Sequence, residues 1–285
     1  MDNSERRFTH IRGAMLNVLT LRSYGNVKLL AFNAKKLKQD FVLVQETRRN
    51  GSEDLMVNDP NLRKWRFIGL GVKEKTHHGV GILLSPRSKC DAVVEIIPGR
   101  IILAYVTIAG QRLALISAYA PTEKYTDSAK QSFWNALSKT AQNSDRSYKL
   151  LIGGDFNATI MPPVTNEYIG DVMAKASYDR AKSTSHNGTE LLNFCPQQSL
   201  YAENTFYPTK KVSHQWTFRS SNSTKYTRRL DYILCCKYLH VHSTNCRSYD
   251  SRLITAHKMV VIDLQVPSKF HRKATRAKAY STTTT

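Results

Sequence analysis

Residues 150–158 read Leu-Leu-Ile-Gly-Gly-Asp-Phe-Asn-Ala, a short apolar run that ends in Asp155 and Asn157. Leucine and isoleucine in so short a run, closed by glycines, indicate a buried strand. One interpretation of the two polar residues is an Asx turn, in which their side chains bond to their own backbone. The other is a functional site, because ligand-binding side chains collect at the ends of strands in open sheets.

Polar residues occupy the same kind of place in five other runs: Asn17 in MLNVLTL, Glu46 after FVLVQ, Tyr119 in LISAYAPT, Asp231 in RRLDYIL and His257 in LITAHKMVV. Each one alone has an ordinary explanation, such as a turn asparagine, a solvated strand end, a packed tyrosine or a core histidine bonded to a carbonyl. Their conjunction favours phosphoryl transfer. That chemistry needs a hard cation, oxygen ligands, a group that positions water and a proton carrier.

The runs of β-branched and aromatic residues predict these strands: Met15–Thr20, Phe41–Gln45, Val80–Leu84, Ala92–Ile97, Ile101–Ile108, Arg112–Tyr119, Leu150–Gly153, Leu230–Cys235 and Met259–Val266. Helical spacing of apolar residues predicts helices over Val27–Leu37, Ser128–Ala141 and Asn187–Gln198. Hairpins alternate with strand-helix-strand units along the chain. This order favours an α/β sandwich over a regular doubly wound sheet.

The chain is expected to hold a single domain over residues 13–266, because no linker rich in glycine, proline or serine divides it. Residues 1–12 are predicted to be an N-terminal extension. Residues 161–185 lack apolar periodicity and are predicted to form an exposed insertion. After Pro267 the sequence is basic, has no acid and has no core pattern, so residues 267–285 are predicted to be a flexible tail.

The charge balance points to a polyanionic partner. The 285 residues include 42 Lys and Arg against 22 Asp and Glu, a net charge of +20. Such an excess suits nucleic acid or an anionic membrane surface. The N-terminus is charged from its second residue, and the longest apolar stretch, 101–109, is shorter than the roughly twenty residues of a membrane span. With five cysteines in no metal-binding pattern, we expect a reducing, intracellular location, nuclear or cytoplasmic, without a membrane partner.

Taken in order, the motifs LNVLTL, VLVQET, GVGILLS, ISAYAPT, IGGDFNA, HQWTFRS, RLDYIL and AHKMVV resemble the endonuclease/exonuclease/phosphatase superfamily over nearly the whole of residues 13–266. Within it, the sequence is most similar to the apurinic-type endonuclease domain of non-LTR (RTE-like LINE) retrotransposons and to craniofacial development protein 2-like sequences. The resemblance implies a DNase I-like fold, a four-layered α/β sandwich of two packed mixed sheets flanked by helices. It also implies a DNA endonuclease that uses Mg²⁺, with Mn²⁺ as the alternative ion.

Carried over position by position, the resemblance implies a role for nine residues. Asn17 and Glu46 would hold the metal, and Tyr119 and Asn157 would contact the scissile phosphate. Asp155 would orient or deprotonate the attacking water, or protonate the leaving oxygen. Asp231 would hold His257, which would hydrogen-bond a phosphate oxygen in the transition state. Trp216 and Arg229 would lie against the substrate, although Trp216 has an equally ordinary interpretation as a core aromatic.

Two positions depart from the family pattern. The family usually ends its catalytic set with Ser-Asp-His, where this chain has Thr255, Ala256 and His257, and an acid of some members is replaced by Leu19. These losses leave open a second hypothesis, a catalytically weakened remnant that only binds nucleic acid. A third is a phosphatase of small phosphate esters, because the fold alone does not name a substrate. The net charge favours DNA, and the sequence carries no prediction of oligomeric state.

Overall fold

The computed structural model describes residues 8–62, 64–72, 77–162, 164, 166–170, 183–208, 214–220 and 227–268. The described strands form two large mixed sheets and one short ribbon. In spatial order, the seven-stranded sheet contains β14 (Ser243–Tyr249), β15 (Met259–Pro267), β1 (Phe8–Asn17), β2 (Phe41–Gln45), β5 (Val80–Leu84), β4 (Arg66–Leu70) and β3 (Ser52–Met56). The six-stranded sheet contains β10 (Leu200–Ala202), β13 (Asp231–Cys236), β9 (Lys149–Asp155), β8 (Gln111–Tyr119), β7 (Ile101–Ile108) and β6 (Ser88–Ile97). The ribbon pairs β11 (Phe218–Arg219) with β12 (Thr227–Arg228).

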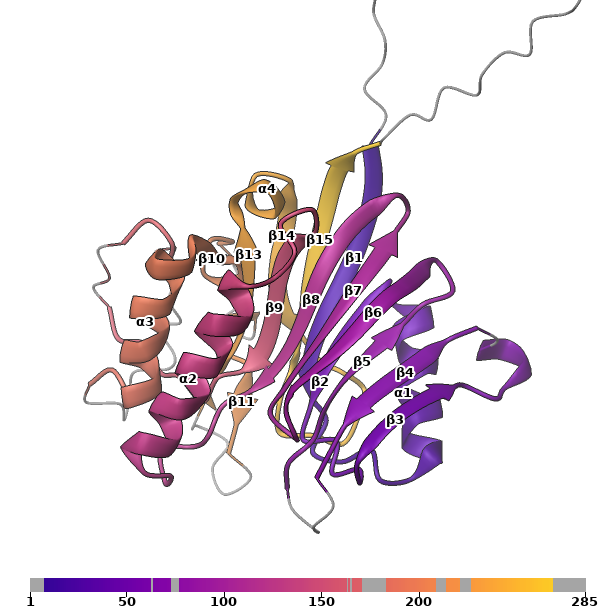
Figure 1. The fold of residues 1–285 in the computed structure, drawn as a ribbon, viewed down its shortest axis with the longest axis horizontal. Helices are drawn as coiled ribbons and strands as arrows, with labels where there is room; N and C mark the ends of the chain where they lie inside the picture. The colour runs from indigo at the N-terminus through magenta and orange to yellow at the C-terminus, as the bar shows by residue number, and fades with distance from the viewer. Residues whose placement is uncertain are drawn as a thin grey trace, which may run out of the picture.

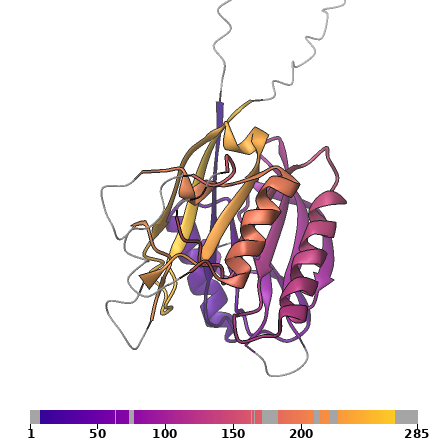
Figure 2. The ribbon, with the colours of Figure 1, turned by 90° about the vertical axis from the view of Figure 1, so that its left-hand side faces the viewer.

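The two large sheets pack face to face, with helices on both outer faces. Met15 and Leu43 of one sheet meet Leu115 and Leu151 of the other in the apolar cluster between them. The helices α2 (Asp127–Gln142) and α3 (His186–Gln198) cover the outer face of the six-stranded sheet, and Figures 1 and 2 show them side by side. Helix α1 (Tyr24–Lys36) covers the other sheet. The four-layered sandwich implied by the resemblance is therefore confirmed.

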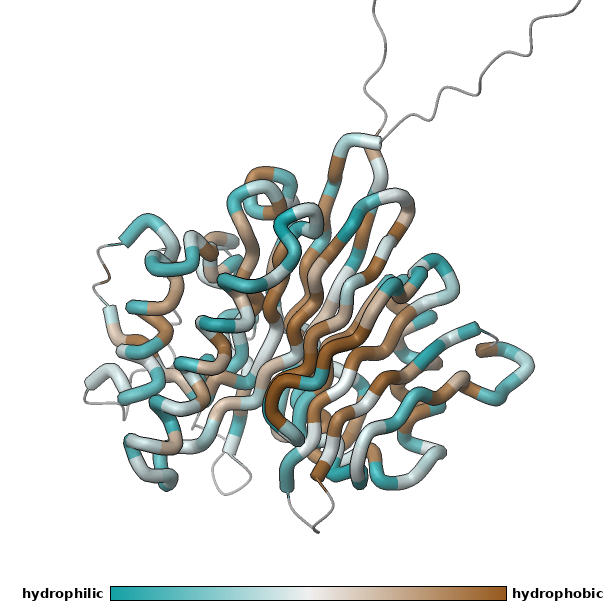
Figure 3. Tube along the Cα trace, viewed as in Figure 1, coloured by the Kyte–Doolittle hydropathy of each residue, from teal (hydrophilic) through white to brown (hydrophobic). Residues whose placement is uncertain are grey.

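Hydropathy follows these layers. Figure 3 shows apolar residues concentrated along the central strands, with polar residues on the loops and the outer turns of the helices. The helices α1, α2 and α3 begin at side-chain caps, as when the Thr126 hydroxyl accepts a bond from the Ala129 amide (3.3 Å), because the first amides of a helix have no partner within it. The short helix α4 (Lys237–His240) has no such cap. No helix in the described part of the chain is long and apolar enough to cross a membrane.

The glycines of the opening motif let the two sheets approach each other. A Cβ atom on Gly153 would lie 2.7 Å from Leu43 Cδ1 of the opposite sheet, which is closer than atoms in a packed core can come. A Cβ atom on Gly154 would overlap the backbone carbonyl of Ala118 in the neighbouring strand. Side chains are therefore excluded at both positions directly before Asp155.

Changing Gly154 to alanine is expected to lower the free energy of unfolding by about 1–3 kcal/mol, because backbone must move to make room for the methyl group. Gly25→Ala is the matched control, since a Cβ atom there meets nothing closer than 3.8 Å. Alanine in the first turn of α1 should leave stability unchanged or raise it by about 0.5–1 kcal/mol. Chemical denaturation of both variants checks this, and equal stabilities would show that Gly154 is not needed for packing.

The boundaries of β2, β5 and β7 are those predicted from the sequence. The first strand differs: β1 begins at Phe8, so residues 8–12, predicted as part of an N-terminal extension, belong to the sheet and pair with the end of β15. Of the predicted insertion, residues 171–182 lie outside the described residues, and so do residues 269–285 of the predicted tail. Ile169, within the insertion, is buried and forms a bridge with Ala202.

Strand register brings the polar motifs together. Strands β1 and β2 are parallel, so Asn17 ends beside Gln45 and next to Glu46. Strands β8 and β9 are also parallel and place Tyr119 opposite Asp155, while antiparallel β13 places Asp231 on the other side of Asp155. Segments far apart in the sequence therefore meet at one edge of the sandwich.

Candidate active site

Two carboxylates converge on one amide. The side-chain nitrogen of Asn17 donates to Glu46 Oε1 (3.0 Å) and to Asp155 Oδ2 (2.9 Å). Asn17 is fully buried and Asp155 nearly so. An arrangement of this kind needs a positively polarised group between the two acids, and here the NH₂ group of Asn17 supplies it. These three predicted residues, from β1, β2 and β9, thus form one cluster.

Glu46 follows β2 in a left-handed backbone conformation (φ +53°) that turns its side chain toward the cluster. The Tyr119 hydroxyl donates to Glu46 Oε1 (2.8 Å), and the Arg48 guanidinium lies 3.2 Å from Oε2. Burial, together with the charges of Glu46 and Asp155, raises the pKa of Tyr119, so the phenol keeps its proton. Tyr119 is therefore a fixed hydrogen-bond donor beside the carboxylates.

Asp155 is the group best suited to exchange a proton. Burial and the neighbouring charge of Asp231 raise its pKa to about 7, against the opposing effects of His257 and of two hydrogen bonds. One of these bonds comes from the Asn157 amide to Oδ1 (3.0 Å), so the predicted Asx turn is present within the site. A carboxyl group whose pKa lies near neutrality can act either as an acid or as a base.

His257 forms a pair with buried Asp231. Its Nδ1 lies 3.0 Å and 3.2 Å from the two carboxylate oxygens of Asp231, and its Nε2 lies 3.9 Å from Asp155 Oδ2. Burial lowers the pKa of His257, but the charge and hydrogen bond of Asp231, with Asp155 and Glu46, raise it to about 9. The ring is therefore an imidazolium at neutral pH, held on one side and turned toward Asp155 on the other.

Asp155, Asp231 and His257 also offer ligand atoms that lie within 4.8 Å of one another. Because His257 Nδ1 is bound by Asp231, this triad is better arranged to hold a proton than a metal. Glu46 and Asn17 supply oxygen atoms outside that pair, and Asn17 Oδ1 accepts a bond from the Leu19 amide (3.1 Å). Asn157, with φ +48°, donates from its side-chain nitrogen to the Ala120 carbonyl (3.0 Å) and so faces the same edge.

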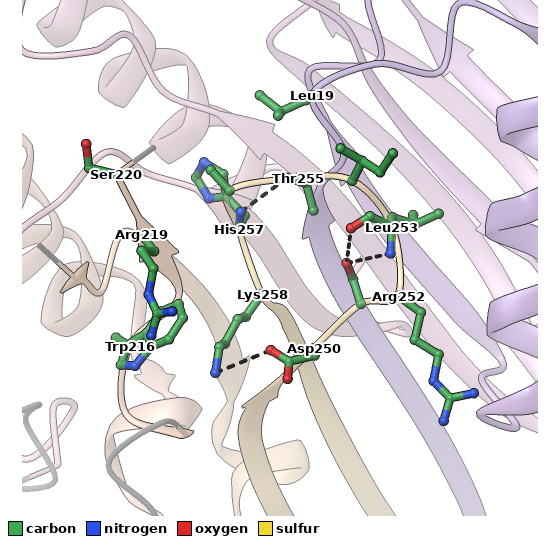
Figure 4. Close-up of a pocket in the computed structure, with 13 residues that line it drawn as sticks. Leu19, Trp216, Arg219, Ser220, Asp250, Arg252, Leu253, Thr255, His257 and Lys258 are labelled. Carbon is green, nitrogen blue, oxygen red and sulfur yellow. Dashed lines mark hydrogen bonds and ion pairs between the residues drawn. The ribbon is translucent and has the colours of Figure 1, made fainter. Parts of the chain in front are cut away.

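Trp216 lies beside this cluster and Arg229 does not join it. The indole of Trp216 lines a pocket of about 660 Å³ that reaches His257 (Figure 4). The Arg229 side chain is buried, and its Nε donates to the Gln215 carbonyl (3.0 Å). The Arg229 side chain thus contacts the residues before β11.

Two further residues connect the parts of the site. The Thr255 hydroxyl donates to the Asn17 carbonyl (2.8 Å) and accepts from the His257 amide (3.2 Å). Arg100 is buried, donates to the carbonyls of Tyr119 (3.3 Å) and Ala120 (3.2 Å), and lies 4.8 Å from the centre of the Tyr119 ring. The bond between Thr255 and Asn17 joins residues 238 positions apart in the chain, so no local sequence pattern marks it.

No other aspartate takes the place of the acid missing at Ala256, within the described residues. Asp250 Oδ1 lies 3.5 Å from Lys258 Nζ, and Asp263 is bound by Arg12 on the far part of β15. The Ala256 carbonyl accepts a bond from the Arg219 amide (2.9 Å), which fixes the backbone but adds no charge. The acidic side chains of the site are thus Glu46, Asp155 and Asp231.

Comparison with solved structures gives the same fold. The AP endonuclease LMAP from Leishmania major has a TM-score of 0.65 at 13% identity, covering 90% of this chain and 88% of that one. The endonuclease domain of TRAS1, a telomere-specific non-LTR retrotransposon, has 0.61 at 16% identity and covers 92% and 100%. The 3′ phosphatase NExo from Neisseria, bound to a product DNA hairpin, has 0.64 at 18% identity and covers 89% and 99%.

A comparison with curated proteins gives no significant match. The sequence profile of the endonuclease/exonuclease/phosphatase family, in contrast, matches residues 17–248, a span that begins at Asn17 and contains every site residue predicted from the sequence except His257. The match covers most of the chain and agrees with the fold and with the cluster at the sheet edge. The chain therefore belongs to the endonuclease/exonuclease/phosphatase family.

Proposed function

We propose that this protein is a divalent-metal-dependent endonuclease of the retrotransposon type, which nicks DNA by direct attack of water on a phosphodiester bond. The observation that carries the proposal is the single cluster of Asn17, Glu46, Asp155 and the Asp231–His257 pair. The cluster contains oxygen donors, a group that titrates near neutrality and a fixed cation. These are the components of metal-assisted phosphoryl transfer.

The donor set fits a hard cation. Two carboxylates point at the same small volume, occupied by the Asn17 amide, and Mg²⁺ is commonly bound through one or two carboxylates while it keeps several waters. We assign Glu46 as the principal ligand and Asn17 as its neighbour, with Mg²⁺ as the ion and Mn²⁺ as the alternative. A cation bound there would neutralise charge that builds up on the phosphate.

The protein side chains would transfer the protons and bind the phosphate. Asp155 takes a proton from the attacking water or delivers one to the leaving sugar oxygen, because its pKa lies near 7. As water adds to phosphorus, the bond from phosphorus to one sugar oxygen breaks and that oxygen is protonated. The His257 imidazolium donates from Nε2 to a phosphate oxygen, while Asp231 holds Nδ1. Tyr119 and Asn157 orient the phosphate.

DNA is the proposed substrate for two reasons. The net charge of +20 suits a long phosphodiester better than a small soluble ester. The similar structures also include two endonucleases and a phosphatase solved with DNA. The second candidate, a weakened remnant that binds DNA without cutting it, is favoured by Leu19 and Ala256, where family members carry acids.

Two substrates separate the three candidates. With Mg²⁺, the protein is expected to convert supercoiled plasmid to nicked circles, to stop when EDTA is added, and to slow steeply as salt rises. Para-nitrophenyl phosphate should be hydrolysed far more slowly than the plasmid is nicked. Hydrolysis of this small ester at a rate independent of salt would favour the phosphatase, and plasmid binding without nicking would favour the remnant.

A further inference from the structure

A pocket next to the candidate active site is lined by basic side chains and by Trp216. It lies between β11 and residues 250–258, has a volume of about 660 Å³, and is bounded by His257 at one end and Trp216 at the other. Figure 4 shows Lys258, Arg219 and Asp250 gathered at the Trp216 end, away from the His257 ring. The pocket thus continues from the proposed reaction centre into a basic recess.

Two cations share the Trp216 indole. Lys258 Nζ lies 3.8 Å, and the Arg219 guanidinium carbon 4.5 Å, from the centre of one of its rings. Trp216 is buried and its backbone carbonyl accepts a bond from the Ser248 hydroxyl (2.8 Å), so the indole forms a fixed platform. Cations over an aromatic face are held in place by the ring. The recess therefore presents two positive charges close together.

Within the described residues, Lys258 forms an ion pair with the exposed carboxylate of Asp250. Asp250 Oδ1 lies 3.5 Å from Lys258 Nζ, and 88% of the Asp250 side chain is exposed against 8% for Lys258. Water screens the charge of a carboxylate that is this exposed, so a competing anion can displace it from Lys258. A phosphodiester oxygen has the same charge and also accepts hydrogen bonds from ammonium and guanidinium groups.

The placement of Lys258 matches a polymer. His257 and Lys258 are consecutive, so their Cα atoms are about 3.8 Å apart, and side chains of successive extended residues point in opposite directions. With His257 at the scissile phosphate, Lys258 would contact a different phosphate of the same DNA strand. Two separate cationic positions suit two phosphates of one polymer better than one small phosphate ester.

We propose that Lys258 and Arg219 bind a DNA backbone phosphate that flanks the scissile one, and that the Asp250 carboxylate occupies this subsite in the free protein. This inference rests on the proposed function, because it needs His257 to lie at the reacting phosphate. It makes Asp250 a competitor of DNA, so removing its charge strengthens binding while removing the charge of Lys258 weakens it.

The test measures binding without cleavage. Fluorescence anisotropy of a labelled DNA duplex in EDTA, over a series of salt concentrations, gives an affinity and a salt slope for each variant. Lys258→Met keeps the stem over Trp216 and should weaken binding about 10-fold, with the slope reduced by about 0.9. Asp250→Asn should tighten binding about 2- to 5-fold. Lys89→Met, at an exposed site on β6, should match the wild type within about twofold.

The double variant Lys258→Met, Asp250→Asn should bind like Lys258→Met, because Asp250 acts by occupying the place next to Lys258. Weaker or unchanged binding by Asp250→Asn would overturn the subsite, and so would an unchanged salt slope for Lys258→Met. Plasmid nicking by the same proteins separates the two claims. Nicking with unaltered binding of the variants contradicts the subsite alone, whereas altered binding without any nicking contradicts only the proposed catalysis.

Discussion

Glu46→Gln is expected to reduce Mg²⁺-dependent nicking of plasmid DNA by more than about 100-fold. Loss of a residue that merely supports a metal ligand costs about 10- to 100-fold, and Glu46 is proposed to be the ligand itself. Glutamine retains an oxygen that accepts from Tyr119 and Asn17, so these two hydrogen bonds survive, whereas the bond from Arg48 to Oε2 is lost. What disappears is the negative charge that attracts the cation.

The measurement is the initial rate of nicked-circle formation at several Mg²⁺ concentrations. Glu95→Gln, an exposed position on β6, is the matched control and should nick at the wild-type rate. Thermal unfolding of both variants reports whether the fold is retained. A folded Glu46→Gln protein that keeps more than a tenth of the wild-type rate would contradict the assignment of Glu46.

His257→Asn is expected to slow nicking about 100- to 1,000-fold, the usual loss when one preorganised donor to a transition-state oxygen is removed. Asparagine still offers an N–H group but no positive charge. His242→Asn is the control, because His242 binds the Tyr238 carbonyl (2.7 Å) away from the site. Nicking by His257→Asn at a rate close to that of the control would show that His257 does not assist the reaction.

The titration of His257 is also expected to make the nicking rate depend on pH. The pKa of His257 is about 9, so the imidazolium is present throughout the neutral range and is lost as the pH rises through 9. The nicking rate should therefore fall on the alkaline side with a midpoint near pH 9. In Asp231→Asn the main group that raises the pKa is gone and burial remains, so the midpoint should move to lower pH. A midpoint that does not move would show that Asp231 is not the cause.

Much of the site was readable from the sequence because its residues end apolar strands. Asn17, Glu46, Tyr119 and Asp155 lie where β1, β2, β8 and β9 end, and both strand pairs are parallel, so these ends meet at one edge. Apolar runs also predicted the bounds of β2, β5 and β7. Local pattern and global fold agree in these strands, which is why their bounds could be predicted.

Other parts depend on contacts that no local pattern encodes. Strands β3 and β14 carry mostly polar residues at the edges of the first sheet and lack the apolar runs of the centre. Thr255 donates a hydrogen bond to Asn17, which lies 238 positions away in the chain. The Lys258 ammonium lies over the Trp216 indole, a contact between the residue before β15 and the segment before β11. Arg229 directly precedes the Leu-Asp-Tyr motif, yet its side chain turns inward to Gln215.

The central claim is that the cluster around Glu46 and His257 suffices for catalysis although Leu19 and Ala256 carry no acid. Nicking of supercoiled plasmid by the wild type and by Ala256→Asp, side by side over a range of Mg²⁺ concentrations, tests it most directly. The account predicts nicked circles with the wild type, abolished by EDTA, and the same rate at a lower Mg²⁺ concentration with Ala256→Asp. Nicking by Ala256→Asp alone, or by neither protein, would contradict it.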